Sequence, residues 1–544
     1  MQSQLKPNRR KNKVLTVEAA VRLIKNDATV TTGGFCGAGV AEEIVLQIEK
    51  QYLETHSPRN LTLVYCAGQG DFASRGMSHL GHEGLVGRII AGYYGASPEL
   101  TRFVIDNKIK AHNLPQGVLS QMFRDIAARK PRTITTVGLK TFVDPRLEGG
   151  KVNAITTDSI VDLIAFDGRE YLAYKTFPID VAILRGTTAD EDGNITMERE
   201  ALTLESLAQA MAVKSSSGIV MVQVERVVQR GTLNPKHVVI PGVLVDVVVV
   251  ADQARHWQTF AEVYNPSFSG ETKVPMATVP PLPMSARKII ARRAAFELRP
   301  GDTVNLGIGM PEGIANVANE EGVLAMVTLT AEPGVIGGMP AGGLNFGAAY
   351  NPQAIIDQPS QFDFYHGGGL DVAFLGLAQV DRFGNLNVSK FGPKLSGAGG
   401  FIDITQNAKK VVFAGTFMAG GIDVAIHDGQ LMIRQEGRAM KFVQDVEQVT
   451  FSGIYAVERR QPVLYITERC VFELTPSGLE LVEVAPGIDM EKDILCQMAF
   501  RPMVGNDVKL MDDRIFRDAP MGLGEHFHIE RHPNLLTGNR SRAS

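Results

Sequence analysis

One internal repeat limits what this chain can fold into more than any other feature. The segment DVAILRGTTADEDGNITM, which begins at Asp180, matches the segment DVAFLGLAQVDRFGNLNV, which begins at Asp371. The two share Asp-Val-Ala, a later Asp and a Gly-Asn pair without a gap, since the starts (180 and 371) and the paired glycines (193 and 384) are both 191 residues apart. A repeat at a fixed offset predicts two copies of one architecture in a single chain.

A second, weaker sequence similarity supports the division of the chain into two related parts. The N-terminal segment LTVEAAVRLIKNDATVTTGGFCGAG predicts a helix from about Thr16, followed by Asp27, a short strand and glycines. The segment SARKIIARRAAFELRPGDTVNLGIGMPEG, from Ser285 to Gly313, repeats this plan with Asp302 before the strand. Both parts of the chain alternate β-rich apolar runs with helical patterns, so we predict an α/β fold made of two related open α/β domains in tandem.

The expected boundary lies in a proline-rich polar stretch. At 544 residues the chain exceeds the size at which one core keeps growing. Residues 265–284, NPSFSGETKVPMATVPPLPM, have the composition of an inter-domain linker. We therefore predict a first domain over residues 1–264, a second domain over 285–520 and a polar tail over 521–544.

Composition argues against several classes of partner. With 44% hydrophobic residues, 21% charged residues and a net charge of -4, the chain is typical of a soluble globular protein and offers no basic surface for nucleic acid. The N-terminus is basic but lacks the apolar core of a secretory signal. The most apolar run, residues 237–252, is broken by Pro241 and Asp246, and we interpret it as buried parallel strands rather than a membrane span.

The cysteines and histidines do not predict a metal site. The four cysteines have no CxxC pair or close histidine, which argues against a zinc or disulfide framework and fits a reducing cytoplasm. His366, in QFDFYHGGGLDV, stands alone and is interpreted as structural. The tail histidines are interpreted as part of a flexible polar terminus rather than a metal-binding surface; they are His526, His528 and His532.

One carboxylate stands before a glycine-rich loop. Residues 323–330, VLAMVTLT, predict a buried strand, and Glu332 follows just past its carboxyl end, in LTAEPGVIGGMPAGGLNFG. In open α/β sheets this edge binds ligands, and glycines let the main chain approach them closely. Taken locally, Glu332 is either part of a ligand site or a solvated acid in a Pro-Gly turn.

Three other loops leave similar alternatives open. Residues 305–313, NLGIGMPEG, either hold a phosphate on backbone N–H groups or form a tight strand-to-helix turn, and they do not match the dinucleotide fingerprint. Residues 394–404, KLSGAGGFIDI, either supply N–H donors to an oxyanion or form a tight turn. Gln116, in NLPQGV before a predicted helix, either donates its amide into a site or is solvated.

Taken together, these motifs resemble the family I CoA-transferases. Six segments carry the resemblance and occur in the order expected for the family: LPQGV, TFVDPRLEGGKVN, LTAEPGVIGG, QFDFYHGGGLDV, DRFGNLNVSKFG and GGFIDI. The resemblance runs from about Val14 to about Gly522. It is strongest to the acetate and short-chain acyl-CoA branch, in which both subunit types are fused into one chain. The resemblance implies two CoA-transferase domains with the active site between them.

The resemblance also implies a mechanism and its residues. Glu332 would attack an acyl-CoA thioester and pass through an acyl anhydride to a glutamyl-CoA thioester, so that CoA is substrate and covalent intermediate, with no metal and no tightly bound cofactor. Gln116 and Gly400 would supply the oxyanion donors. The residues expected to contact CoA are Gly307, Ile308, Gly309 and Met310, with Gly397 and Gly399 in the turn before Gly400.

The resemblance also implies substrates and an assembly, while alternative functions stay open. Acetate, propionate, butyrate and acetoacetate are the expected acids, and a homo-oligomer, a tetramer, is the expected assembly. The alternatives are a CoA-thioester hydrolase, a non-catalytic ligand sensor and a nicotinamide-binding protein. One departure concerns Pro333, where the family often has a small polar residue, because proline removes a backbone donor beside Glu332.

Overall fold

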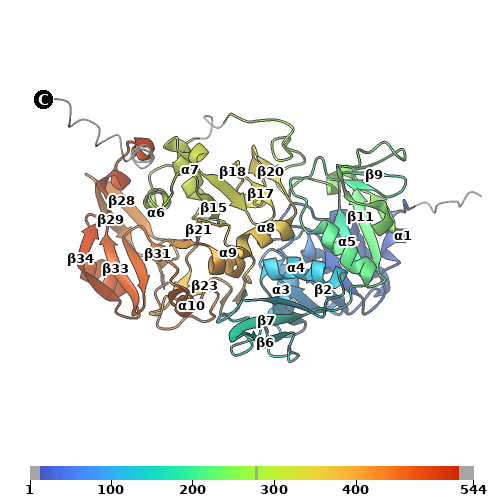
Figure 1. The fold of residues 1–544 in the computed structure, drawn as a ribbon, viewed down its shortest axis with the longest axis horizontal. Coiled ribbons are helices and arrows are strands. Elements are labelled where there is room, and N and C mark those ends of the chain that lie inside the picture. Colours follow the sequence, from blue (N-terminus) through green and yellow to red (C-terminus); the bar gives the residue numbers. More distant parts are fainter. Residues whose placement is uncertain (1–12, 276–279, 526–544) are drawn as a thin grey trace, which may run out of the picture.

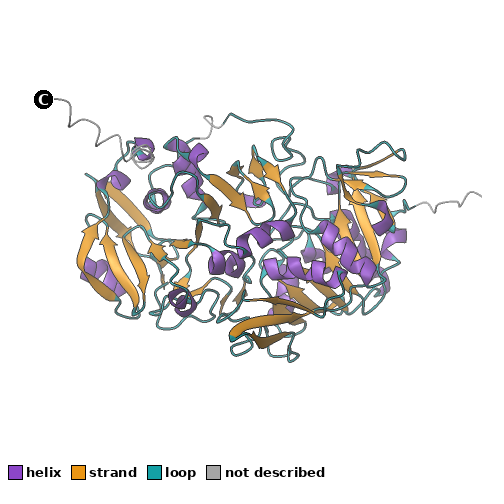
Figure 2. Cartoon of the chain, in the orientation of Figure 1, coloured by secondary structure: helices purple, strands orange, loops and turns teal. Residues whose placement is uncertain are grey.

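The computed structural model describes residues 13–275 and 280–525 and contains two large sheets, one in each half of the chain. In Figure 1 the first half, blue to green, lies on the right, and the second half, yellow to red, lies on the left. Helices lie against both sheets (Figure 2). The prediction of two tandem α/β domains is confirmed.

The first half is built on a seven-stranded sheet in which every neighbouring pair is parallel. Its order is β14-β11-β8-β1-β2-β3-β4. The strands are β1 Thr29–Thr32, β2 Leu61–Tyr65, β3 Val86–Ala91, β4 Lys110–Asn113, β8 Val181–Arg185, β11 Ile219–Val224 and β14 Val247–Val250. The sheet is covered on both sides, because alternate residues of β8, β11 and β14 belong to two different core clusters, and these three strands are accordingly rich in apolar residues.

The second half is built on a ten-stranded mixed sheet with the order β20-β17-β16-β15-β21-β26-β31-β32-β33-β34. Its five central strands are parallel: β16 Thr328–Ala331, β15 Thr303–Leu306, β21 Val372–Gly376, β26 Lys410–Ala414 and β31 Val463–Ile466. The flanking strands are β17 Val335–Ile336, β20 Ala354–Ile355, β32 Cys470–Thr475, β33 Gly478–Val484 and β34 Met503–Leu510.

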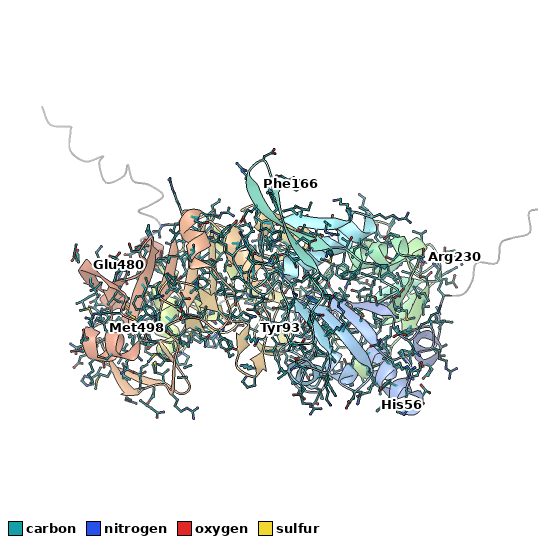
Figure 3. The ribbon with its side chains drawn as sticks, turned by 90° about the horizontal axis from the view of Figure 1, so that it is seen from below. His56, Tyr93, Phe166, Arg230, Glu480 and Met498 are labelled. Atoms are coloured by element: carbon teal, nitrogen blue, oxygen red, sulfur yellow. The ribbon has the colours of Figure 1, made fainter. Side chains whose placement is uncertain are left out.

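The helices and smaller sheets complete the two halves. The helices are α1 Val17–Val21, α2 Glu42–Thr55, α3 Pro98–Ile105, α4 Gln116–Ala127, α5 Ser206–Ser215, α6 Ala286–Ala295, α7 Glu312–Glu320, α8 Gln358–His366, α9 Phe401–Asn407 and α10 Gly453–Glu458. The smaller strands of the first half are β5 Arg132–Thr135, β6 Val161–Phe166, β7 Arg169–Lys175, β9 Thr188–Asp190, β10 Ile195–Thr196, β12 Arg226–Val228 and β13 Val238–Ile240. The β6–β7 hairpin projects from the body of the protein, with Phe166 near its tip (Figure 3).

The internal repeat has a physical basis. Asp180 and Asp371 each precede a central strand, and each accepts the first N–H of the neighbouring strand at 2.8 Å, from Thr29 and Thr303 respectively. Further along, each copy contains an Asp whose carboxylate accepts bonds from an Asn four residues later at 3.0 and 2.9 Å. The repeated residues therefore form the same strand connection and the same turn in each half of the chain.

Two sequence predictions about strands are partly wrong. Residues 323–330 are not one strand, because a 3₁₀ turn over Leu324–Met326 precedes β16. The apolar run 237–252 contains β13, which pairs antiparallel with β10, and only β14 joins the parallel sheet. Pro241 separates the two strands, since proline cannot donate to a ladder.

The predicted helix starts are confirmed, although the first helix is short. Thr16 caps α1 by accepting from the N–H of Ala19, but α1 ends at Val21. Ser285 caps α6 by accepting from the N–H of Lys288. The three tail histidines lie outside the described residues.

Candidate active site

A cavity of about 140 Å³ lies where the two halves meet, and both halves line it. It opens at the carboxyl ends of parallel strands from both sheets: loops after β1 and β2 supply one side, and loops after β15 and β16 supply the other. Ligands bind at this edge in open α/β sheets. Its lining residues are Phe35, Cys36, Ala67, Gly68, Phe72, Tyr93, Gln116, Gly307, Ile308, Glu332, Phe346, Leu375, Ala398, Gly399, Gly400, Phe401 and Ile404.

Glu332 lines this cavity, one residue past the end of β16. The pKa of its carboxyl group is raised to about 7, mainly by burial and to a smaller extent by the charge of Asp403, whereas hydrogen bonds from the backbone and from Asn305 oppose the rise. Removing a carboxylate from water disfavours its charged form. Glu332 is therefore a desolvated acid whose two protonation states are both populated near neutral pH.

Asn305 belongs to a polar network beside this acid. Its amide donates to the carbonyl of Thr330 at 3.3 Å and to the hydroxyl of Tyr365 at 3.2 Å, and that hydroxyl donates to Thr330 Oγ1 at 2.8 Å. All three side chains are buried. The network holds the end of β16, and with it the start of the Glu332 loop, in one position.

Gln116 is the first residue of α4 and reaches the cavity from the other half of the chain. It is 2% exposed, so the interpretation of a solvated turn residue is wrong. Its backbone N–H donates to the carbonyl of Gly399 at 3.0 Å, and its side-chain amide donates to Oε1 of Gln358 at 3.3 Å. An amide has two N–H donors, so one remains for a ligand.

The Gly397–Gly400 turn is held against the first half. The N–H of Gly399 donates to the carbonyl of Gly92 at 2.7 Å, and the N–H of Ala398 donates to Oδ1 of Asn113 at 2.9 Å. Gly397 has a φ of +86°, and an added Cβ would lie 2.9 Å from the carbonyl oxygen of Gly92. Within the described part of the chain, the N–H of Gly400 has no acceptor.

Some of the predicted site residues lie outside the cavity wall. Gly307 and Ile308 line it, but Gly309, Met310 and Gly397 do not. The carbonyl of Gly309 accepts from Arg287 at 2.9 Å, and Met310 packs against the core of the second sheet. The cavity thus brings together Glu332, Gln116, Gly307, Ile308, Gly399 and Gly400.

Sequence reasoning missed the aromatic walls. Phe35 and Phe346 come from opposite halves with ring centroids 5.5 Å apart, and both line the cavity. Tyr93 lies near the junction of the halves (Figure 3). The repeat contained a signal for Phe35, because GGFCG follows β1 as GIGMP follows β15.

A further polar network lies near the junction. His366 bonds to Asp403 and to Gln121, in keeping with the structural interpretation of this residue. No group of three or more metal-ligating side chains gathers anywhere in residues 13–275 and 280–525. Over the same ranges, no helix has the length and apolar character needed to cross a membrane.

The fold and the cavity agree with comparisons to known proteins. The coenzyme A transferase family model matches residues 14–251 and 287–487, and the chain belongs to this family. It is therefore an enzyme that transfers CoA. Two similar curated proteins are the caffeate CoA-transferase of Acetobacterium woodii, 50% identical over 94% of this chain and 98% of that protein, and the acetate CoA-transferase YdiF of Escherichia coli K12, 46% identical over 94% and 96%.

A solved structure supports the fold along almost the whole chain. The acyl-CoA transferase YdiF of Escherichia coli O157:H7, determined as a thioester complex with CoA, superposes with a TM-score of 0.89 at 44% identity. The similarity covers 94% of this chain and 97% of that chain.

Proposed function

We propose that this enzyme moves CoA between acyl-CoA and short-chain carboxylates, such as acetate, propionate, butyrate and acetoacetate, through a glutamyl-CoA thioester on Glu332. The observation that carries the proposal is one desolvated carboxylate in a cavity that both halves line, with Gln116 and Gly400 among the other lining residues. The similarity to an acetate CoA-transferase and to an acyl-CoA transferase solved as a thioester complex with CoA supports it.

The chemistry needs a nucleophile and donors to a transient oxyanion. The Glu332 carboxylate attacks the thioester carbonyl, and the tetrahedral intermediate expels CoA thiolate to leave an acyl anhydride. The thiolate then attacks the glutamyl carbonyl, which releases the first carboxylate and forms the glutamyl-CoA thioester. An acceptor carboxylate reverses these steps. Each tetrahedral oxyanion would accept bonds from the free N–H of the Gln116 amide and from the N–H of Gly400.

The apolar walls favour transfer over hydrolysis. Five aromatic side chains line the cavity, and they restrict the access of water to the anhydride and to the thioester; they are Phe35, Phe72, Tyr93, Phe346 and Phe401. An acceptor carboxylate that fits this cavity therefore competes well against water. Gly307 and Ile308 lie on the wall that the second half supplies, and we propose that they contact the CoA arm.

Three further assignments rest on the family resemblance and the sequence. We propose that the domains span residues 1–264 and 285–520, joined by a linker over 265–284 and followed by a polar tail over 521–544. We also propose a cytoplasmic homotetramer.

Mass spectrometry tests the proposal. After brief incubation with acetyl-CoA, the wild-type protein should gain the mass of CoA less one water on the peptide that contains Glu332, and Glu332→Gln should gain none. Glu491→Gln is the matched control, because Glu491 is exposed and pairs with Arg501 far from the cavity. Absence of the adduct, or transfer by Glu332→Gln at the wild-type rate, would reject the proposed nucleophile.

Product analysis separates transfer from hydrolysis. With acetyl-CoA and propionate, the enzyme should produce propionyl-CoA and acetate. Free CoA and acetate at the same rate with and without propionate would instead identify a thioester hydrolase.

A further inference from the structure

Asp403 is a fully buried carboxylate at the junction of the two halves. It is the third residue of α9, and Gly400 lies at the N-cap of the same helix. Its Oδ2 accepts the N–H of Gly117 at 3.1 Å, and its Oδ1 accepts from Nε2 of His366 at 2.9 Å. One side chain thus joins α9 to α4 of the other half and to α8.

The bond to Gly117 lies directly behind Gln116. Two consecutive N–H groups of α4 donate to the second half: that of Gln116 to the carbonyl of Gly399, and that of Gly117 to Asp403. The approach is close, because a Cβ on Gly117 would lie 2.6 Å from Asp403 Oδ1 and 2.5 Å from Phe362 Cδ1. In Figure 1, α4 meets α8 and α9 at the centre of the molecule.

His366 fixes the orientation of this carboxylate. The side-chain amide of Gln121 donates to Nδ1 of His366 at 3.0 Å and to Oδ1 of Asp363 at 2.7 Å. Since Nδ1 accepts, the hydrogen-bond network assigns the ring proton to Nε2, which donates to Asp403. Both Asp403 oxygens therefore act as acceptors, as a carboxylate does.

We propose that Asp403, held by His366, is a positioning residue for CoA transfer: it ties the first turn of α4 to the first turn of α9 and so fixes Gln116 and Gly400 at one separation. This inference rests on the proposed function, in which these two residues donate to the oxyanion. Donors stabilise a transition state only when they are held in place beforehand, and a displacement of about 1 Å costs roughly 100-fold in rate.

Asp403 also acts on Glu332 through its charge, which gives a readout that a purely structural residue would not give. The other titratable groups coupled to Glu332 are the thiol of Cys36 and the hydroxyl of Tyr365, and burial raises the pKa of both. Burial raises the pKa of Cys66 and Tyr174 as well, which lie near Asp403. These four groups are uncharged near neutral pH, so loss of the Asp403 charge should lower the pKa of Glu332.

The test is Asp403→Asn, with Asp357→Asn as the matched control. Asparagine keeps the shape, but its NH₂ group must face either Gly117 N–H or His366 Nε2–H, both of which are donors. Asp357 also forms a bond between the two halves, because its carboxylate accepts from Arg124 at 3.1 Å. It contacts neither Gly117 nor His366. Asp403→Asn should lower kcat roughly 10- to 100-fold with little change in KM, and it should move the acidic limb of the kcat profile to lower pH. Asp357→Asn should do neither.

A second pair of variants keeps the inference testable if Asp403→Asn fails to fold. His366→Leu removes the donor to Asp403 and should lower kcat, whereas His366→Gln supplies an amide donor and should restore most of it. Wild-type kcat and an unshifted pH profile in Asp403→Asn would overturn the inference, as would equal activity of the two His366 variants. These outcomes are distinct from failure of the proposed function, which would show as a wild-type enzyme without a CoA adduct on Glu332.

Discussion

Gln116 and Gln358 are 242 residues apart in the chain, yet the side-chain amide of Gln116 donates to Oε1 of Gln358 at 3.3 Å. Both side chains are buried, so this bond is shielded from water. It orients the Gln116 amide with its nitrogen toward the second half of the chain and leaves its other N–H as a donor.

The first prediction concerns this donor. Gln116→Leu keeps the approximate volume of the side chain and should lower kcat by about 10²- to 10³-fold, which is the usual effect of losing one oxyanion donor. Steady-state kinetics with acetyl-CoA and propionate measure it. Gln51→Leu is the control, because Gln51 bonds to the carbonyl of Ser57 on the far side of the first half. A kcat within about twofold of the wild-type value would contradict the assignment of Gln116.

The rate of adduct formation should depend on pH through Glu332. In the proposed mechanism only the carboxylate attacks, and the pKa of Glu332 is raised to about 7, mainly by burial. The rate should therefore rise with pH and reach half its maximum near pH 7, as followed by quenched mass spectrometry. A midpoint near 4.5, the ordinary value for a glutamate, would show that Glu332 is solvated.

The same raised pKa predicts an effect on thermal stability. The folded protein holds the Glu332 proton more tightly than the unfolded chain, so this contribution to stability is present below pH 4.5 and is lost as pH rises through about 7. Glu332→Gln keeps a neutral side chain at every pH. Its Tm relative to wild type should therefore be higher at pH 8 than at pH 5 in calorimetry. The same difference at both values would rule out this linkage.

The loop after Glu332 should tolerate a methyl group at one glycine and not at another. Gly334 has a φ of +118°, and an added Cβ would lie 2.0 Å from the carbonyl oxygen of Ile356. Gly343, in the same loop, has a φ of +62° and open space around it. Both alanine variants carry backbone strain of about 1–3 kcal/mol, but only Gly334→Ala adds a collision. It should lower Tm and transfer activity well below those of Gly343→Ala, as measured by calorimetry and kinetics.

The cysteines should differ sharply in reactivity. Cys496 is exposed, whereas burial raises the pKa of Cys36 to about 12 and also raises the pKa of Cys66 and Cys470. Thiolates are the reactive form. Iodoacetamide at pH 8 should therefore modify Cys496 and leave Cys36 intact, although Cys36 lines the cavity. Peptide mapping of the wild type and of Cys496→Ser shows which thiols react; rapid labelling of Cys36 would contradict its predicted inertness.

Much of the fold could be predicted because its signals are local. The starts of α1 and α6 follow from Thr16 and Ser285, whose side chains cap the next turn. The repeat was visible because both copies keep an Asp that accepts the same backbone N–H at 2.8 Å. Residues 323–330 were mispredicted because a continuous apolar run does not distinguish a short turn from a buried strand.

The candidate site was predictable only in part, because it depends on contacts between distant segments. Glu332 stood out as a lone acid at a strand end, but the local pattern left a solvated turn residue equally open, and only the family resemblance pointed to a site. The burial of Gln116 depends on Gly399 and Gln358, which no spacing in the sequence connects to it. The aromatic walls were missed because a phenylalanine in a loop has the same local pattern whether it lines a cavity or packs in a core.

The continuous chain between the two halves has a consequence for how the enzyme responds to dilution. Glu332 belongs to one half and Gln116 to the other, so two separate subunits would lose the site whenever they dissociated. Joining them makes their encounter intramolecular, with an effective concentration in the millimolar range for short flexible connections. The stoichiometry is fixed at one to one, and the pairing of Glu332 with Gln116 is independent of how much protein is present.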